Sequence, residues 1–209
     1  GEVWENAADK VAYGSRRRYL QGGQLDSVMN YPFRTSVINF ALGGNAGELA
    51  NTLTMLYASY PKCVSDNLMN IVGTHDTDRI LTELGDLGYD SLGLSNAELS
   101  VRKMSPENRA RAIKLLKIVS TVQFTVYGVP SVYYGDEAQI KGLTETMEGC
   151  RYPMPWNSDF EQTENYKLYS KIIKLRNKTK ALRRGGMKFI YSEGRTFALA
   201  RFYKDEAFV

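Results

Sequence analysis

The 209-residue chain has a single histidine, only two cysteines and no long apolar run. Cys63 and Cys150 are too few for a disulfide framework and lack the paired spacing of a zinc site, so we expect free thiols in a reducing, cytoplasmic compartment. No stretch approaches the roughly 20 apolar residues that a membrane helix needs. The opening GEVWENAADK is neither basic enough nor apolar enough for a signal peptide and is typical of the middle of a protein.

The charge balance is only weakly basic, with 27 Lys and Arg against 23 Asp and Glu. The one basic run, from Arg16 to Arg18, follows an amphipathic stretch and does not form a tail. We therefore expect neither a nucleic acid nor a membrane as a partner. Because 43% of the residues are hydrophobic, the chain can bury a substantial core.

Short apolar runs alternate with helical patterns along the chain. The spacing of apolar residues predicts helices over 6–20, between Asn45 and Pro61, from Ser105 onward, and over 165–178. Four apolar runs that end in polar residues lie between or before these helices: GEVWE, LDSVMNYPF, LMNIVGTHDT and GVPSVYYGDE. The polar segment 84–102 is expected to be a loop.

This alternation is the pattern of βα units around a parallel sheet, which predicts an α/β fold. An eight-stranded βα barrel needs about 250 residues, and only four of its units can be counted here. After Gly185 and Gly186 the pattern changes to two alternating runs, MKFIY and TFALARFY, separated by SEGR. Those runs predict an antiparallel hairpin.

Acidic residues follow the apolar runs, where a barrel places its catalytic groups at the carboxyl ends of its strands. The residues at these positions are Glu2, Asp26, His75 with Asp76, and Asp136 with Glu137. Taken alone, each of these residues can also have an ordinary structural role in place of a catalytic one. Glu2 can be a terminal residue, Asp76 a helix cap or surface carboxylate, and His75 a hydrogen-bonded packing residue.

Five ordered motifs together resemble one enzyme family. GEVWENA, DSVMNYPF, NIVGTHDTDRI, GVPSVYYGDE and CRYPMPW resemble motifs of the α-amylase superfamily, glycoside hydrolase family thirteen, and most of all its cyclomaltodextrinase and neopullulanase branch. The resemblance implies that residues 1–184 are the C-terminal half of a TIM (β/α)8 barrel, with strands five to eight. It implies that residues 185–209 are the truncated start of an antiparallel β C-terminal domain.

The resemblance also implies a role for several residues. Glu2 matches the general acid/base, and Asp76 matches the carboxylate that binds sugar hydroxyls and stabilises the cationic sugar. His75 matches a histidine that hydrogen-bonds the substrate, and Arg79 matches an arginine that positions it. Asp78 stands where many members of the family have proline.

Aromatic residues near the strand ends are candidates for walls of the sugar site, because the C–H faces of sugars pack on aromatic rings. The candidates are Trp4, Tyr31 and Phe33. Most of the 14 tyrosines are instead expected to lie in the core and at interfaces. We expect Asp136 and Glu137 to shape the loop after the last strand, by pairing with Arg151, and not to attack a sugar.

The catalytic set implied by the resemblance is incomplete in this chain. A retaining glycosidase needs a carboxylate nucleophile about 5 Å from its acid. In the family this aspartate follows the fourth strand together with an arginine and a second histidine, and a chain with one histidine cannot contain that set. The resemblance therefore implies a fragment of a retaining α-glucan hydrolase that cleaves α-1,4-glucosidic bonds in starch-derived oligosaccharides or cyclodextrins and is inactive alone.

The open edges of half a barrel predict self-association. No cofactor and no metal are expected in this chain, although calcium is bound by many members of the family. Two alternatives stay open. One is a non-catalytic amylase-like scaffold or glucan-binding module, which would have no need to retain Glu2, His75 and Asp76 together. The other is an enzyme that transglycosylates or acts on α-1,6 links.

Overall fold

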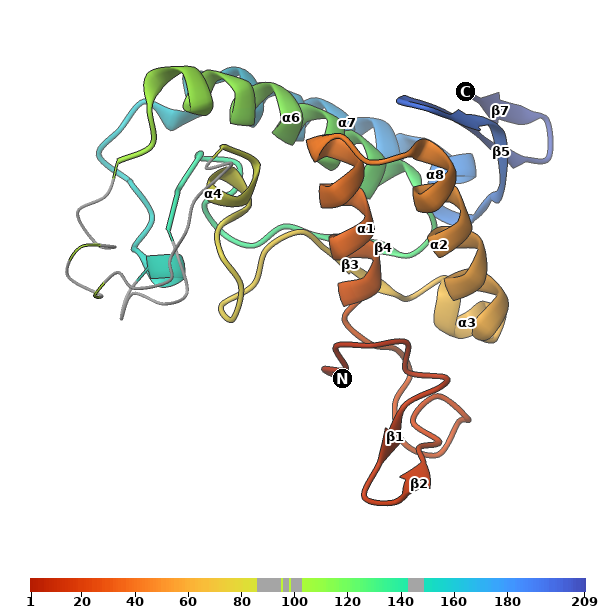
Figure 1. Cartoon of the computed structure of the whole chain (residues 1–209). Helices are drawn as coiled ribbons and strands as arrows, with labels where there is room; N and C mark the ends of the chain where they lie inside the picture. The colour runs from red at the N-terminus through yellow and green to blue at the C-terminus, as the bar shows by residue number, and fades with distance from the viewer. Residues whose placement is uncertain (86–94, 96–97, 99–102, 143–148) are drawn as a thin grey trace. The chain divides into compact units, whose positions relative to one another are not determined.

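The computed structural model describes residues 1–85, 95, 98, 103–142 and 149–209 (Figure 1). The chain divides into two compact units. Unit 1 comprises residues 1–71, 122–131 and 173–209, and unit 2 comprises residues 72–121 and 132–172. Each unit is therefore assembled from segments that are far apart in the sequence.

A set of short parallel strand segments lies at the centre of unit 1. Strand β3 (Met69–Ile71) pairs in parallel with β4 (Val129–Ser131). On the other side of β3, Met29 forms a parallel bridge with Met69, and the Met29 amide donates to the carbonyl oxygen of Gly1 at 2.9 Å. The four segments thus lie beside one another in chain order, which confirms the predicted parallel pairing of β3 and β4.

Helices α1 (Tyr31–Leu42) and α2 (Ala46–Ser59) pack against each other in unit 1 and precede the short helix α3 (Lys62–Ser65). The predicted cap of α2 is confirmed, because the Asn45 side chain accepts a hydrogen bond from the Gly47 amide at 2.7 Å. Helix α1 was not predicted, since the run LDSVMNYPF suggested only a buried strand.

The predicted helix over 6–20 is wrong. This segment forms turns and a small antiparallel hairpin of β1 (Val11–Ala12) and β2 (Ser15–Arg16). Tyr13 and Gly14 between these strands have φ angles of +53° and +76°, which lie outside the right-handed helical region. The apolar side chains of this segment do not form one buried helix face either, because Ala7 and Leu20 near its ends are buried, whereas Val11 and Tyr13 are 65% and 94% exposed.

The apolar core of unit 1 joins its opening segment to α2 and to the residues before β3. Its buried side chains are Val3, Ala7, Leu20, Val28, Leu56, Tyr60, Val64 and Leu68. Full burial of each large apolar side chain contributes about 1.5–3 kcal/mol. This cluster therefore holds the start of the chain, with Glu2, in a fixed place within unit 1.

An antiparallel sheet of three strands follows helix α8 (Lys180–Arg184) in unit 1. Strands β5 (Gly186–Glu193) and β6 (Thr196–Tyr203) confirm the predicted hairpin, and β7 (Glu206–Phe208) pairs with β6. The sheet supports the expectation of a change in architecture near residue 185. The assignment of residues 185–209 to a separate β-domain stays a prediction.

Unit 2 contains α4 (Ile80–Gly85) and the 3-10 turns Gly149–Arg151 and Phe160–Gln162. Helices α6 (Pro106–Thr125) and α7 (Glu164–Lys178) begin in unit 2 and end in unit 1, and both were predicted. Most of the expected loop over 84–102 lies outside the described residues, and residues 84 and 85 close α4. Within the part of the chain that the structure describes, no helix has the length and apolar character to cross a membrane.

Candidate functional site

Glu2 lies in unit 1 beside two aromatic side chains. The Tyr31 hydroxyl donates a hydrogen bond to Glu2 Oε1 at 2.6 Å. The Tyr31 ring stacks on the Trp4 ring, with centroids 4.0 Å apart and planes inclined by 16°. Trp4 is 51% exposed, so this group combines a carboxylate held by a phenol with an aromatic surface open to solvent.

The buried Asn30 fixes the backbone at the start of α1, next to Tyr31. Asn30 accepts a hydrogen bond from the Phe33 amide at 3.2 Å, which caps α1 and places Tyr31 at its first position. The Asn30 side-chain nitrogen Nδ2 donates to Asn70 Oδ1 in β3 at 2.9 Å. The hydrogen bonds of Asn30 therefore link the start of α1, which carries the Tyr31 hydroxyl, to strand β3.

Two of the three predicted aromatic walls take other roles in the structure. Phe33 is 0% exposed and packs in the core, so its ring cannot line a sugar site at the surface as predicted. Tyr31 is also buried, and its polar end is engaged by Glu2. Of the three, Trp4 alone has half of its surface in contact with solvent.

The second group of predicted residues lies in unit 2. His75 Nε2 is 3.1 Å from Asp76 Oδ2, and Arg151 Nη2 donates to Asp76 Oδ1 at 3.0 Å. Arg151 Nε also donates to the His75 carbonyl oxygen at 3.0 Å. All three side chains are partly open to solvent. Both carboxylate oxygens of Asp76 are therefore oriented, and the group stays accessible to a polar ligand.

A tight turn of threonines fixes the backbone at Asp76. The Thr74 amide donates to Thr77 Oγ1 at 2.9 Å, and the Asp76 amide donates to Thr74 Oγ1 at 3.1 Å. Side-chain hydroxyls that bind nearby amides stabilise turns of this kind. The run GTHDT therefore contains the threonines that form the turn as well as His75 and Asp76, the two polar residues that follow Thr74.

Beneath this turn, unit 2 contains a fully buried ion pair. Arg79 Nη1 lies 3.6 Å from Asp136 Oδ1, and both side chains are 0% exposed. The Arg79 guanidinium also lies over the rings of Tyr133 and Tyr134, at 4.3 and 4.5 Å from their centroids. Burial raises the pKa of the Tyr133 hydroxyl from its ordinary value near 10 to about 12.

This burial changes the part assigned to Arg79, which cannot contact a sugar directly in this structure. Arg79 follows the turn around Asp76 in the sequence and pairs with Asp136 in the loop after β4.

The predicted pairing of Arg151 with Asp136 and Glu137 is wrong. Asp136 is buried opposite Arg79, whereas Arg151 lies at the surface and binds Asp76. Glu137 accepts a hydrogen bond from the Gly135 amide at 2.9 Å, which is a contact within its own loop. The contribution of Arg151 was missed because the motif CRYPMPW has no spacing relation to Asp76 in the sequence.

Glu2 and Asp76 belong to different units. That both lie in one catalytic site at the carboxyl ends of the barrel strands, as the family resemblance implies, therefore stays a prediction. Among the described residues, no group of three or more His, Cys, Asp or Glu side chains is arranged to hold a metal ion.

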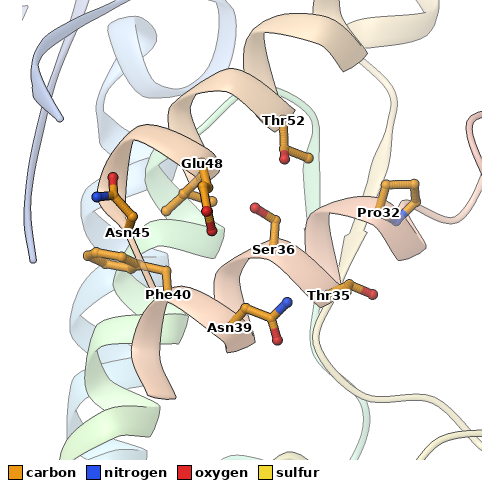
Figure 2. Close-up of a pocket in the computed structure, with 9 residues that line it drawn as sticks. Pro32, Thr35, Ser36, Asn39, Phe40, Asn45, Glu48 and Thr52 are labelled. Carbon is orange, nitrogen blue, oxygen red and sulfur yellow. The ribbon is translucent and has the colours of Figure 1, made fainter. Parts of the chain in front are cut away.

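A separate cleft of about 330 Å³ lies between α1 and α2 (Figure 2). Its lining combines apolar side chains with hydroxyl, amide and carboxylate groups, which come from residues such as Ser36, Asn39 and Glu48. Phe40 is nearly buried and packs near Phe197, with ring centroids 5.9 Å apart, so the cleft offers no exposed ring on which a sugar could stack.

Comparison with known proteins gives consistent results. The family model described as the catalytic domain of alpha amylase matches residues 1–185. A cyclomaltodextrinase of Thermoanaerobacter pseudethanolicus is 29% identical over 211 residues, and neopullulanase 2 of Thermoactinomyces vulgaris is 30% identical over 210 residues. These matches cover 100% and 99% of this chain but only 30% of either relative.

Solved structures show the same relation. The type III pullulan hydrolase of Thermococcus kodakarensis matches 99% of this chain and 32% of its own, with a TM-score of 0.78 and 28% identity. The cyclic α-maltosyl-(1→6)-maltose hydrolase of Arthrobacter globiformis, solved in complex with cyclic α-maltosyl-(1→6)-maltose, matches 99% of this chain and 39% of its own. Its TM-score is 0.76 and its identity 27%.

Proposed function

Since the chain belongs to the α-amylase catalytic-domain family, we propose that it is the C-terminal half of the catalytic TIM (β/α)8 barrel of a retaining α-glucan hydrolase. Residues 1–184 would supply strands five to eight, and residues 185–209 would begin the following β-domain. The side-by-side order of Gly1, Met29, β3 and β4 supports this assignment. The family match, which ends at residue 185, supports it as well.

Glu2 is the proposed general acid/base, and the observation that carries this role is its hydrogen bond from Tyr31 beside the open Trp4 ring. A general acid must be held in one orientation to protonate the glycosidic oxygen and later to activate water. Asp76 and His75 are proposed to bind sugar hydroxyls and to stabilise the positive charge that develops on the sugar ring. Arg151 holds Asp76 in place.

The carboxylate nucleophile is proposed to lie in a part of the protein outside these 209 residues. Without it, no glycosyl-enzyme intermediate can form, so the chain by itself would be inactive. The proposed substrates of the whole enzyme are starch-derived oligosaccharides or cyclodextrins cleaved at α-1,4 links. The cyclomaltodextrinases and neopullulanase among the relatives support this substrate class.

Calorimetric titration of the chain with maltotriose tests the proposed sugar site. We expect Asp76→Asn to weaken binding about tenfold or more, because a hydrogen bond to a charged group contributes roughly 1.5–3 kcal/mol. Glu2→Gln is expected to weaken binding to a smaller extent, since the amide keeps the shape of the carboxylate.

Glu5→Gln is the matched control for this titration. Glu5 lies in the same opening segment and pairs with Lys10 at 2.5 Å, so its replacement should leave the affinity unchanged. Equal affinities of the wild-type chain, Glu2→Gln and Asp76→Asn would contradict the proposed site.

A second prediction concerns the open edges of the parallel strands. Backbone groups of an unpaired edge pair readily with another strand, and two half-barrels together have the eight strands of a closed barrel. We therefore expect multi-angle light scattering to show dimers or larger species at micromolar concentration. A folded monomer over the same concentrations, verified by circular dichroism, would count against self-association.

A further inference from the structure

The β1–β2 hairpin carries a tyrosine in a conformation that tyrosine rarely adopts. Tyr13 and Gly14 form the two-residue turn, with φ angles of +53° and +76°. Turns with positive φ at both central residues favour Asn or Gly at the first position, and a bulky residue there is strained. Because the Tyr13 ring is 94% exposed, no burial offsets this strain. The folding stability of the hairpin therefore does not explain a tyrosine at its tip.

The ring is nevertheless held in place by its neighbours. The Arg17 guanidinium lies 5.7 Å from the centre of the Tyr13 ring and 5.4 Å from the centre of the Tyr19 ring. Arg16 donates to the Ala8 carbonyl oxygen at 3.0 Å and pairs with Asp9 at 3.1 Å. These contacts order the hairpin, so a ligand that stacks on Tyr13 would meet a preorganised surface.

The hairpin is anchored in the same segment that carries Glu2. The Ala7 amide donates to the Tyr60 hydroxyl at 3.0 Å, and Asn6 Nδ2 donates to Ser59 Oγ at 3.2 Å. Figure 1 shows the hairpin in red, on the side of unit 1 where α1 begins and where the N-terminus lies. It thus extends unit 1 outward from the end of the chain at which Glu2 meets Tyr31.

The exposed side chains at the tip of the hairpin suit a sugar ligand better than a protein partner. Tyr13 and Val11 are its exposed large apolar side chains, and together they provide far less than the roughly 800 Å² that each partner buries in a stable protein interface. A pyranose ring needs only one aromatic face. Arg16 pairs with Asp9, and Arg17 lies over the Tyr13 ring, so two of the three arginines of the run 16–18 already have partners within the segment.

We propose that the β1–β2 hairpin is an outlying binding site for an α-glucan chain, in which Tyr13 stacks on a sugar remote from the cleaved bond. This proposal rests on the function proposed above. The proposed site would make the protein bind long glucan chains more tightly than short ones.

The test is a calorimetric titration of the full chain with maltotriose and with maltoheptaose. Tyr13→Asn places a residue suited to the turn at the tip, and it should not lower the urea concentration at the midpoint of unfolding. It is expected to weaken maltoheptaose binding about three- to tenfold, which is the contribution of one aromatic contact. Maltotriose binding should stay unchanged.

Tyr191→Asn is the control, because Tyr191 is a half-exposed tyrosine on β5 and should not affect either sugar. Equal maltoheptaose affinities of Tyr13→Asn and wild type would overturn the hairpin proposal and leave the proposed function intact. A lowered unfolding midpoint with unchanged binding would show that Tyr13 is structural and would also overturn it. Absence of binding of both sugars to the wild-type chain would contradict the hairpin and the proposed function together.

Discussion

Replacing Arg79 by methionine should destabilise the protein by about 3–5 kcal/mol, because it leaves the buried Asp136 carboxylate without its guanidinium. Native domains are stable by only about 5–15 kcal/mol, so the variant is expected to lie near the limit of folding. Urea unfolding followed by circular dichroism measures the loss. The stacking of the guanidinium on Tyr133 and Tyr134 would be lost as well.

A double-mutant cycle separates the ion pair from these other effects. Arg79→Met combined with Asp136→Asn removes both charges, and we expect it to cost less than the sum of the two single changes by about 1–3 kcal/mol. Lys62→Met is the control, because it breaks an exposed pair with Asp66 and should cost less than about 0.5 kcal/mol. A similar cost for Arg79→Met and Lys62→Met would mean that the Arg79–Asp136 pair is solvated.

Replacing Arg201 by methionine is expected to cost about 3–4 kcal/mol. This side chain of β6 is buried and donates to the carbonyl oxygens of Thr125, Gly185 and Gly186, at 2.5, 3.0 and 3.1 Å. Buried acceptors that lose their donors each cost about 1–3 kcal/mol, and methionine supplies no donor. Unfolding in urea measures the change.

The variants Arg201→Lys and Arg195→Met sharpen this prediction. Lysine keeps the charge but cannot reach three carbonyl groups as a planar guanidinium does, so Arg201→Lys should recover less than half of the loss. Arg195 makes one long contact of 3.4 Å to the Ala41 carbonyl oxygen, and its replacement should cost less than about 0.5 kcal/mol. Equal effects at 195 and 201 would contradict the view that Arg201 fastens the sheet to the end of α6.

Elements with strong local signals were predictable from the sequence. Asn45 and Ser105 have side-chain oxygens that cap the first turn of a helix, and both helices begin where these residues stand. The alternation in MKFIY and TFALARFY likewise identified the β5–β6 hairpin. In each case a few adjacent residues contain the whole signal.

The secondary-structure predictions that were wrong or absent have physical causes. The start of α1 had readable signals, with Asn30 as its cap and Pro32 in its first turn, but the apolar run before it favoured a strand. The segment 6–20 has apolar residues at helical spacing, yet Gly14 permits a turn there, and only Ala7 and Leu20 near its ends are buried apolar side chains.

Site contacts were harder to predict because they join residues far apart in sequence. The motifs located Glu2, His75 and Asp76, but they gave no information about which arginine meets which acid. In the structure Arg79 pairs with Asp136, whereas Arg151, which was predicted to do so, pairs with Asp76. This pairing depends on which of the acids is buried, and the packing in three dimensions decides that.

The interleaved composition of unit 1 has a consequence for its biosynthesis. Its parallel strands need Gly1, Met29, β3 and β4, and its closing contacts need Arg201. Because translation proceeds from the N-terminus, almost all of the 209 residues must leave the ribosome before all of these contacts of unit 1 can form. Until then the early strands have exposed edges, and we expect nascent chains to depend on chaperones more than a protein with mainly local contacts would.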